Sequence, residues 1–158
     1  MSDLVWRGIV IGLGATILMD VWAIILSCFP GQNRPNWAPV GRWVWHLQHG
    51  QVFHRAIGEA SRYAHEQALG WVFHYAVGIL YGVIFAFLVG AAWFAHPSFW
   101  PAWVWGIVTI AAGWFLLLPG LGLGWMASKT PAPAVTRFLG LVAHTVFGFG
   151  LYATALML

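Results

Sequence analysis

Residues 70–78 read GWVFHYAVG and residues 140–148 read GLVAHTVFG, so both stretches follow the pattern G-x-V-x-H-x-x-x-G. Residues four apart lie on one face of a helix, and each stretch therefore places a histidine, His74 or His144, between two glycines along a single stripe. Both stretches lie inside apolar runs long enough to cross a bilayer. An ionisable side chain is costly at that depth and usually faces the protein interior, so the pattern predicts membrane helices that meet along these stripes.

The composition is typical of an integral membrane protein. Of 158 residues, 61% are hydrophobic and only 7% are charged, whereas soluble domains carry about 25% charged residues. The net charge of +3 is small and scattered, which argues against nucleic acid as a partner. Cys28 is the only cysteine, so an internal disulfide and a thiolate metal cluster are excluded. No hydrolase, nucleotide-binding or dinucleotide-binding motif is found.

The hydropathy pattern predicts an all-α bundle of four transmembrane helices that forms one integral-membrane domain over residues 1–158 and contacts the lipid bilayer. The predicted spans are residues 4–29, 69–94, 101–118 and 135–158. Residues 30–68 form the water-facing segment between the first two spans. Its tryptophans favour an interfacial helix, and we expect residues 53–67 to form a polar helix that leads into the second span.

A weak internal repeat relates the two halves of the chain. The third span begins VWGIV at residues 104–108, and the first begins VWRGIV at residues 5–10, while the second and fourth spans share the histidine pattern. Two parallel helical hairpins, related by an axis along the membrane normal, are therefore one alternative. A chance match between glycine-rich segments is the other.

The basic residues predict the orientation in the membrane. One side of the predicted bundle carries a single arginine, Arg7, and the other carries six basic residues: Arg34, Arg42, Arg55, Arg62, Lys129 and Arg137. By the positive-inside rule, residues 30–68 are cytoplasmic. The chain is then expected in a bacterial inner (cytoplasmic) membrane with both termini on the periplasmic side.

The candidate functional residues are ionisable groups at membrane depth. Asp20 lies on a face of the first span with small and polar residues, and it is expected to converge with His74 and His144 inside the bundle, with Glu66 at the mouth of the site. Carboxylate and imidazole groups together suit a divalent transition metal such as zinc, iron or manganese. Three further residues are expected at the cytoplasmic rim: His54, His65 and Arg137.

Two other interpretations of the same residues stay open. Two histidines on separate spans are also compatible with haem b, although a row of glycines usually draws helices too close for a macrocycle. Alternatively, the polar side chains only form hydrogen bonds that hold the helices in register, at about 0.6 to 2 kcal/mol each.

Several motifs together resemble an uncharacterised bacterial family of four-span inner-membrane proteins, a domain of unknown function. The motifs are Gly14-Ala15-Thr16 with Met19-Asp20, Glu66 with Gly70-Trp71 and His74-Tyr75, Pro119 with Ala127-Ser128-Lys129-Thr130-Pro131, and His144 with Phe147-Gly148. The resemblance implies an inner-membrane bundle in which these Asp, Glu and His positions belong to the family pattern. It implies no activity, substrate or cofactor.

The sequence therefore favours a small transporter-like module that handles ions or protons at Asp20, His74 and His144. A membrane metalloenzyme, or a metal- or haem-binding protein, would use the same residues, so enzymatic activity stays open. A structural or assembly partner of other membrane proteins would need no site. Four short spans enclose little volume, which makes a homo-oligomer a further expectation.

Overall fold

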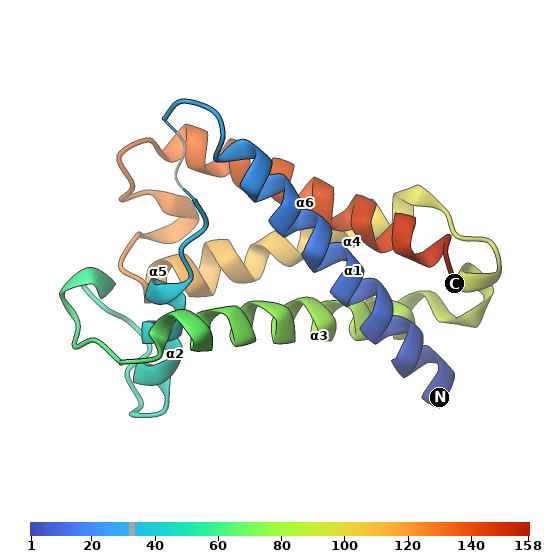
Figure 1. Cartoon of the computed structure of the whole chain (residues 1–158), viewed down its shortest axis with the longest axis horizontal. Coiled ribbons are helices and arrows are strands. Elements are labelled where there is room, and N and C mark those ends of the chain that lie inside the picture. Colours follow the sequence, from blue (N-terminus) through green and yellow to red (C-terminus); the bar gives the residue numbers. More distant parts are fainter. Residues whose placement is uncertain (32–33) are drawn as a thin grey trace. The chain divides into compact units, whose positions relative to one another are not determined.

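The computed structural model describes residues 1–31 and 34–158, and within this part 74% of the residues are helical and no strand occurs (Figure 1). Four helical segments there are long and apolar enough to cross a membrane: Ser2–Leu26, Glu66–Ala95, Phe99–Gly120 and Pro133–Ala155. The predicted all-α, four-span fold is confirmed, and the chain is a multi-pass membrane protein.

The first, second and fourth spans are the helices α1 (Ser2–Leu26), α3 (Glu66–Ala95) and α6 (Pro133–Ala155). The third span combines α4 (Phe99–Ala112), a π-helical segment η2 (Gly113–Leu117) and the short α5 (Leu118–Gly120). Between the spans lie α2 (Ala38–Leu47) and two 3₁₀ turns, η1 (Ile57–Glu59) and η3 (Trp125–Ala127).

The chain divides into two compact units, and the first contains Met1–Pro35, Tyr75–Thr109 and Leu141–Leu158. In this unit α1 crosses the later part of α3 obliquely (Figure 1). Glycines allow the close approach: a Cβ on Gly8 would lie 2.6 Å from Val83 Cα, and one on Gly12 would lie 2.5 Å from Gly78 O. Small residues at contacts between membrane helices have this effect because they let the backbones meet.

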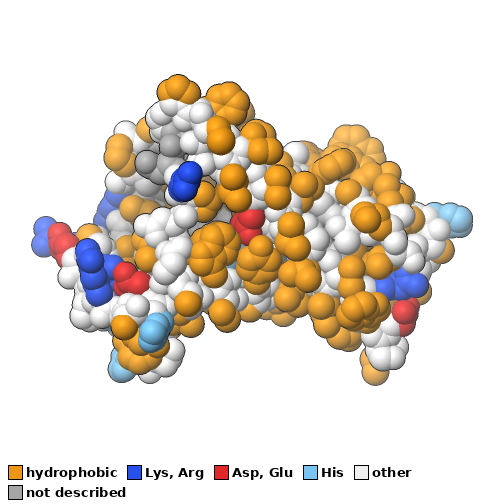
Figure 2. Space-filling model, in the orientation of Figure 1, with side chains coloured by type: hydrophobic (Ala, Val, Ile, Leu, Met, Phe, Trp, Pro, Cys, Tyr) orange, Lys and Arg blue, Asp and Glu red, His pale blue; other side chains and the backbone are white. Residues whose placement is uncertain are grey.

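The core of the first unit lies along the same helix contacts. Its fully buried members include Ile11, Ala15, Phe85 and Leu151. The opposite face of α1 is apolar but exposed, as expected of a surface that contacts lipid, and Figure 2 shows hydrophobic side chains over much of the visible face. Ile24 on this face, for example, is 57% exposed.

The second unit contains Asn36–His74 and Ile110–Gly140. Its core consists of four buried side chains from α2, η1 and the turn after α5: Val40, Trp43, Ile57 and Leu121. The predicted helix within the segment between the first two spans is confirmed as α2.

The polar helix predicted for residues 53–67 is wrong. Apart from the single turn η1, residues 51–63 are irregular, and Ala56 and Ala60 on either side of it have extended backbone. The reason lies in the contacts of the second unit. Arg42 Nη1 donates hydrogen bonds to the carbonyl oxygens of Ile57, Gly58 and Ala60 at 2.9, 3.3 and 3.4 Å. Carbonyls that bind a side chain are not available to a helical hydrogen-bond ladder.

The third span continues two residues past its predicted end at Leu118 and includes Pro119. A proline ring normally clashes with the carbonyl one turn earlier. Here the preceding turn is a wider π turn, closed by the Leu118 N–H and Gly113 O. The wider turn accommodates the ring, so the helix ends at Gly120 instead of before the proline.

Candidate functional site

Asp20 occupies the inner face of α1 in the first unit. Only 8% of it is exposed, and no other charged residue lies between Arg7 and Arg34. The Tyr75 hydroxyl of α3 donates a hydrogen bond to Asp20 Oδ2 at 2.7 Å. Asp20 is therefore a membrane-depth carboxyl group held by a neutral hydroxyl.

The glycine seam between α1 and α3 brings Tyr75 to Asp20. Thr16, one turn before Asp20, donates its hydroxyl to Gly12 O at 2.7 Å, and its side chain fills the place that a Cβ on Gly78 would take. The two helix backbones are consequently close at the level of the carboxyl group. The sequence predicted this inner face of α1, which the burial of Gly12, Thr16 and Asp20 confirms.

His144 lies in the same unit, on the face of α6 that contacts α4. Its Nδ1 is 3.0 Å from Thr109 Oγ1 and 3.0 Å from Gly106 O, and Thr109 itself donates to Gly106 O at 2.7 Å. A carbonyl only accepts, and the Thr109 hydrogen is already directed at it, so Nδ1 must carry the hydrogen. In the neutral ring the lone pair then lies on Nε2, which is the atom that can take a proton or bind a metal.

His74 lies in the second unit, on the first part of α3. Its ring stacks on Trp37, with centroids 3.9 Å apart and planes 23° apart, and it also contacts the edge of Trp71 at 5.9 Å. A Cβ on Gly70 would collide with the backbone oxygen of Trp37. Gly70 therefore allows the chain just before α2 to lie on α3 and to cover His74 with an indole.

Glu66, at the start of α3, forms an ion pair with Arg42 of α2. Arg42 Nε donates to Glu66 Oε2 and Nη2 donates to Oε1, each at 2.8 Å. The side chains are only 7% and 14% exposed. The hydrogen bond to Glu66 raises the pKa of Arg42 above its usual value, although burial acts in the opposite direction. Both carboxylate oxygens are thus occupied by an arginine that stays charged.

The predicted rim residues His54, His65 and Arg137 lie in the second unit. Two of them, His54 and Arg137, form hydrogen bonds with backbone carbonyl oxygens at a helix end and in a loop. The backbone N–H and Nδ1 of His54 both lie 3.0 Å from Gly120 O, the last residue of the third span. Arg137 Nε donates to Met126 O at 2.7 Å, and the His65 ring contacts the edge of Tyr63 at 5.7 Å. Histidine and arginine near a helix C-terminus commonly satisfy such carbonyls.

The described contacts place the four predicted metal ligands in different surroundings. Asp20 and His144 belong to the first unit, and His74 and Glu66 belong to the second. Among residues 1–31 and 34–158, no group of three or more His, Cys, Asp or Glu side chains could hold a metal ion. The site of four ligands stays a prediction.

Sequence reasoning missed the partners of these groups, which are Tyr75, Thr109, Trp37 and Arg42. The sequence offered one signal for Tyr75. This residue directly follows His74, so its polar hydroxyl lies on the helix next to the stripe of Gly70, His74 and Gly78. Arg42 is 24 positions from Glu66, and no helical spacing could have paired them.

Residues 9–158 match the model of a family described as "Protein of unknown function (DUF2938)". The chain belongs to this family. The match confirms the resemblance to an uncharacterised family, and the family description names no activity. Comparisons with curated proteins and with solved structures returned no match. Within this DUF2938 protein, function must therefore be argued from the residues themselves.

Proposed function

We propose that the chain is a proton- or ion-handling, transporter-like membrane protein in which Asp20, His74 and His144 exchange protons. The observation that carries the proposal is the Asp20 carboxyl group, 8% exposed within a membrane span and bound by the Tyr75 hydroxyl. An ionised side chain within a membrane span is costly, up to about 2.5 to 3.5 kcal/mol at the middle of the helix on insertion scales, so such a group is a functional candidate by default.

The Tyr75 hydroxyl suits a carboxyl group that changes its protonation state. A tyrosine O–H can donate to a carboxylate and can also accept from a carboxylic acid. The contact with Asp20 can therefore persist whether or not the proton is bound. An arginine partner, such as the one that holds Glu66, would instead favour the ionised state alone.

His144 supplies a proton acceptor of a second kind. With Nδ1 directed at Gly106 O, the neutral ring takes a proton on Nε2 and becomes an imidazolium, and it returns to the same tautomer when that proton leaves. His74 immediately precedes Tyr75 in α3. We assign it the same role, with the stacked Trp37 covering one face of its ring.

A metal site using the same residues is the second candidate, and a structural role is the third. A metal ion would need several of these side chains as ligands at once, whereas each of them can take and release a proton by itself. Haem b would need Nε2 atoms from both histidines on one iron. For cargo larger than a proton, four short spans enclose little volume, so we expect a homo-oligomer.

Proton flux into liposomes tests the proposal. The full chain is reconstituted with a pH-sensitive dye inside, and a potassium diffusion potential drives protons inward. Asp20→Asn should lower the protein-dependent flux by more than about tenfold, and Tyr75→Phe should lower it less because only the hydroxyl is lost. Glu59→Gln, which changes an exposed carboxyl group outside the spans, is the matched control.

Two results would overturn proton exchange at this site. One is flux that is unchanged in Asp20→Asn, His74→Ala and His144→Ala when each variant elutes as a folded protein. The other is near-stoichiometric zinc, iron or manganese by elemental analysis, or a Soret band from haem, which is lost in the same variants. The first result favours the structural role and the second favours the metal or haem site.

A further inference from the structure

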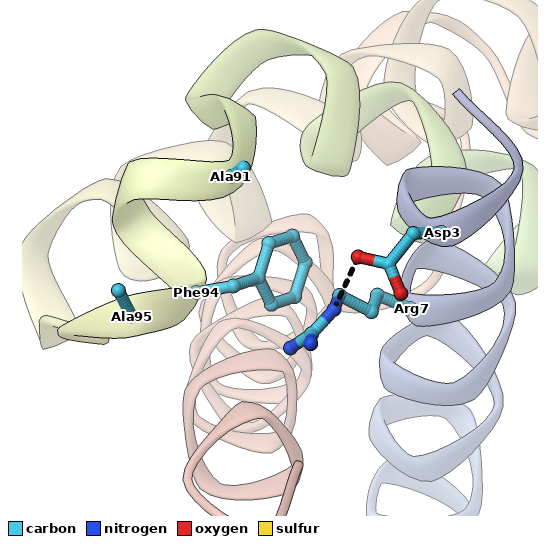
Figure 3. Close-up of a pocket in the computed structure, with 5 residues that line it drawn as sticks. All are labelled: Asp3, Arg7, Ala91, Phe94 and Ala95. Carbon is cyan, nitrogen blue, oxygen red and sulfur yellow. Dashed lines mark hydrogen bonds and ion pairs between the residues drawn. The ribbon is translucent and has the colours of Figure 1, made fainter.

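A small hollow opens at the end of the first unit where α1 begins and α3 ends (Figure 3). Its volume is about 150 Å³, and it is lined by Asp3, Arg7, Ala91, Phe94 and Ala95. This is smaller than the roughly 300 Å³ of the smallest pockets for drug-sized ligands. The hollow therefore suits only a small group.

A break in α3 builds one wall of the hollow. Gly90 has φ 69° and ψ −179°, a conformation that is essentially restricted to glycine. The last turn of α3 leaves the direction of the helix at this point. Figure 3 shows that this turn, which carries Ala91, Phe94 and Ala95, lies across the hollow from α1 and that the Phe94 ring points toward Arg7.

The other wall carries one positive and one negative group. Arg7 Nε donates to Asp3 Oδ2 at 2.8 Å, and Arg7 Cζ lies 5.4 Å from the centre of the Phe94 ring, which orients the guanidinium. Within the described part of the chain, the hydrogen bond found for these two side chains joins Arg7 Nε and Asp3 Oδ2. The two Nη groups and Asp3 Oδ1 are left to bind a ligand.

We propose that this hollow binds the phosphoethanolamine headgroup of a membrane phospholipid. The Nη groups of Arg7 match phosphate oxygens, and Asp3 Oδ1 accepts from the primary ammonium. The pair lies in the first two turns of a membrane span, and the ends of a helix that crosses the bilayer are expected to reach the lipid headgroups. Ala91, Phe94 and Ala95 then contact the carbon atoms that link the headgroup to the acyl chains. This inference does not depend on proton exchange at Asp20.

The chemistry of the hollow favours ethanolamine over other headgroups. Choline carries a trimethylammonium group that cannot donate a hydrogen bond and prefers an open aromatic face, whereas Arg7 covers the Phe94 ring. An anionic lipid would have only one cation, already paired with Asp3, and would be repelled by the carboxylate. A phosphate and an ammonium on one headgroup use both charges of the hollow.

Lipid retention measured by native mass spectrometry tests the proposal. The full chain is released from nanodiscs made of equal parts phosphatidylethanolamine and phosphatidylcholine, and the retained lipids are identified. Wild-type protein should retain phosphatidylethanolamine preferentially. Asp3→Asn should reduce this preference by about fivefold while lipid is still retained, and Arg7→Gln should reduce retention of both lipids. Arg55→Gln, which removes an exposed guanidinium of the second unit, should change neither.

The same measurement contains the contrary outcomes. An exposed i,i+4 ion pair contributes little to folding, so both variants should stay folded. Equal retention of the two lipids by wild-type protein, or an unchanged preference in both variants, would overturn the headgroup site. Displacement of the lipid by soluble phosphoethanolamine at equal concentration would overturn the assignment to a lipid, because the acyl chains would then contribute nothing.

Discussion

Asp20 and Glu66, two of the acidic residues in the spans, differ in what binds them. Glu66 meets a bidentate guanidinium, and Asp20 meets a hydroxyl group. The sequence predicted Glu66 at the mouth of the Asp20 site because it lies two turns before His74. That spacing carries no information on Arg42, whose side chain reaches Glu66 from a different helix. We therefore assign Glu66 a structural role and keep Asp20 as the functional candidate.

Breaking the Arg42–Glu66 pair should destabilise the protein strongly. Arg42→Gln leaves a largely buried carboxylate and three carbonyls without their donor, which should cost about 3 to 5 kcal/mol. Arg42→Lys should cost about 2 kcal/mol because an ammonium cannot replace the fork. Thermal unfolding in detergent measures both. The double variant Arg42→Gln/Glu66→Gln should recover part of the lost stability. The same melting temperature for the wild type and all variants would contradict a stabilising role of the ion pair.

Two histidines should show the less common neutral tautomer with hydrogen on Nδ1. His144 directs Nδ1 at Gly106 O, and His54 directs Nδ1 at Gly120 O. Both carbonyls only accept. In ¹⁵N-histidine-labelled protein at a pH where the rings are neutral, solid-state NMR should give protonated Nδ1 and bare Nε2 signals that disappear in His144→Gln and His54→Gln. Protonated Nε2 signals at these positions would contradict the hydrogen-bond assignment.

At the scale of helices, packing in the first unit depends on glycines, which have no side chain to keep two helix backbones apart. Gly8 and Gly12 of α1 meet the backbone of α3, and Gly148 of α6 meets α4 with 2.9 Å between its would-be Cβ and Ala102 O. The sequence predicted the small face of α1 because small residues recur with helical spacing. It could not predict the π turn before Pro119 or the irregular residues 51–63, because both depend on contacts between distant parts of the chain.

Adding a methyl group at Gly78 should loosen the contact between α1 and α3. An alanine Cβ there would collide with Thr16 Oγ1, and overpacking of this kind costs about 1 to 3 kcal/mol. Gly113→Ala is the control, because a Cβ at Gly113 meets nothing within 4 Å. Gly78→Ala should lower the melting temperature in detergent, and Gly113→Ala should leave it nearly unchanged. The same melting temperature for both would remove the glycine seam as a source of stability.

At the scale of the molecule, hydropathy alone predicted the fold. The four predicted spans agree with the observed helices to within about three residues at each end, since a bilayer requires long apolar helices whatever their contacts. The candidate site was predicted less completely. Asp20, His74 and His144 are visible in the sequence as ionisable groups in apolar runs, but their partners arise from tertiary packing. These partners distinguish the two acidic residues, because Asp20 accepts a hydrogen bond from a tyrosine hydroxyl and Glu66 forms an ion pair with an arginine.

The orientation of the whole chain is the last prediction, and it follows from the distribution of basic residues. In the first unit, the N end, the C end and the turn between α3 and α4 lie toward the same end (Figure 1), which is the end that carries Arg7. The other six basic residues lie in the segments between the first and second spans and between the third and fourth, or, for Arg137, in the first turns of α6. The positive-inside rule places those segments in the cytoplasm.

Alkaline phosphatase fused after Leu158 should therefore be active, and the same enzyme inserted after Gly50 should be inactive, whereas green fluorescent protein should fluoresce only at Gly50. The reverse pattern would invert the orientation and would place the Asp3–Arg7 hollow in the cytoplasmic leaflet.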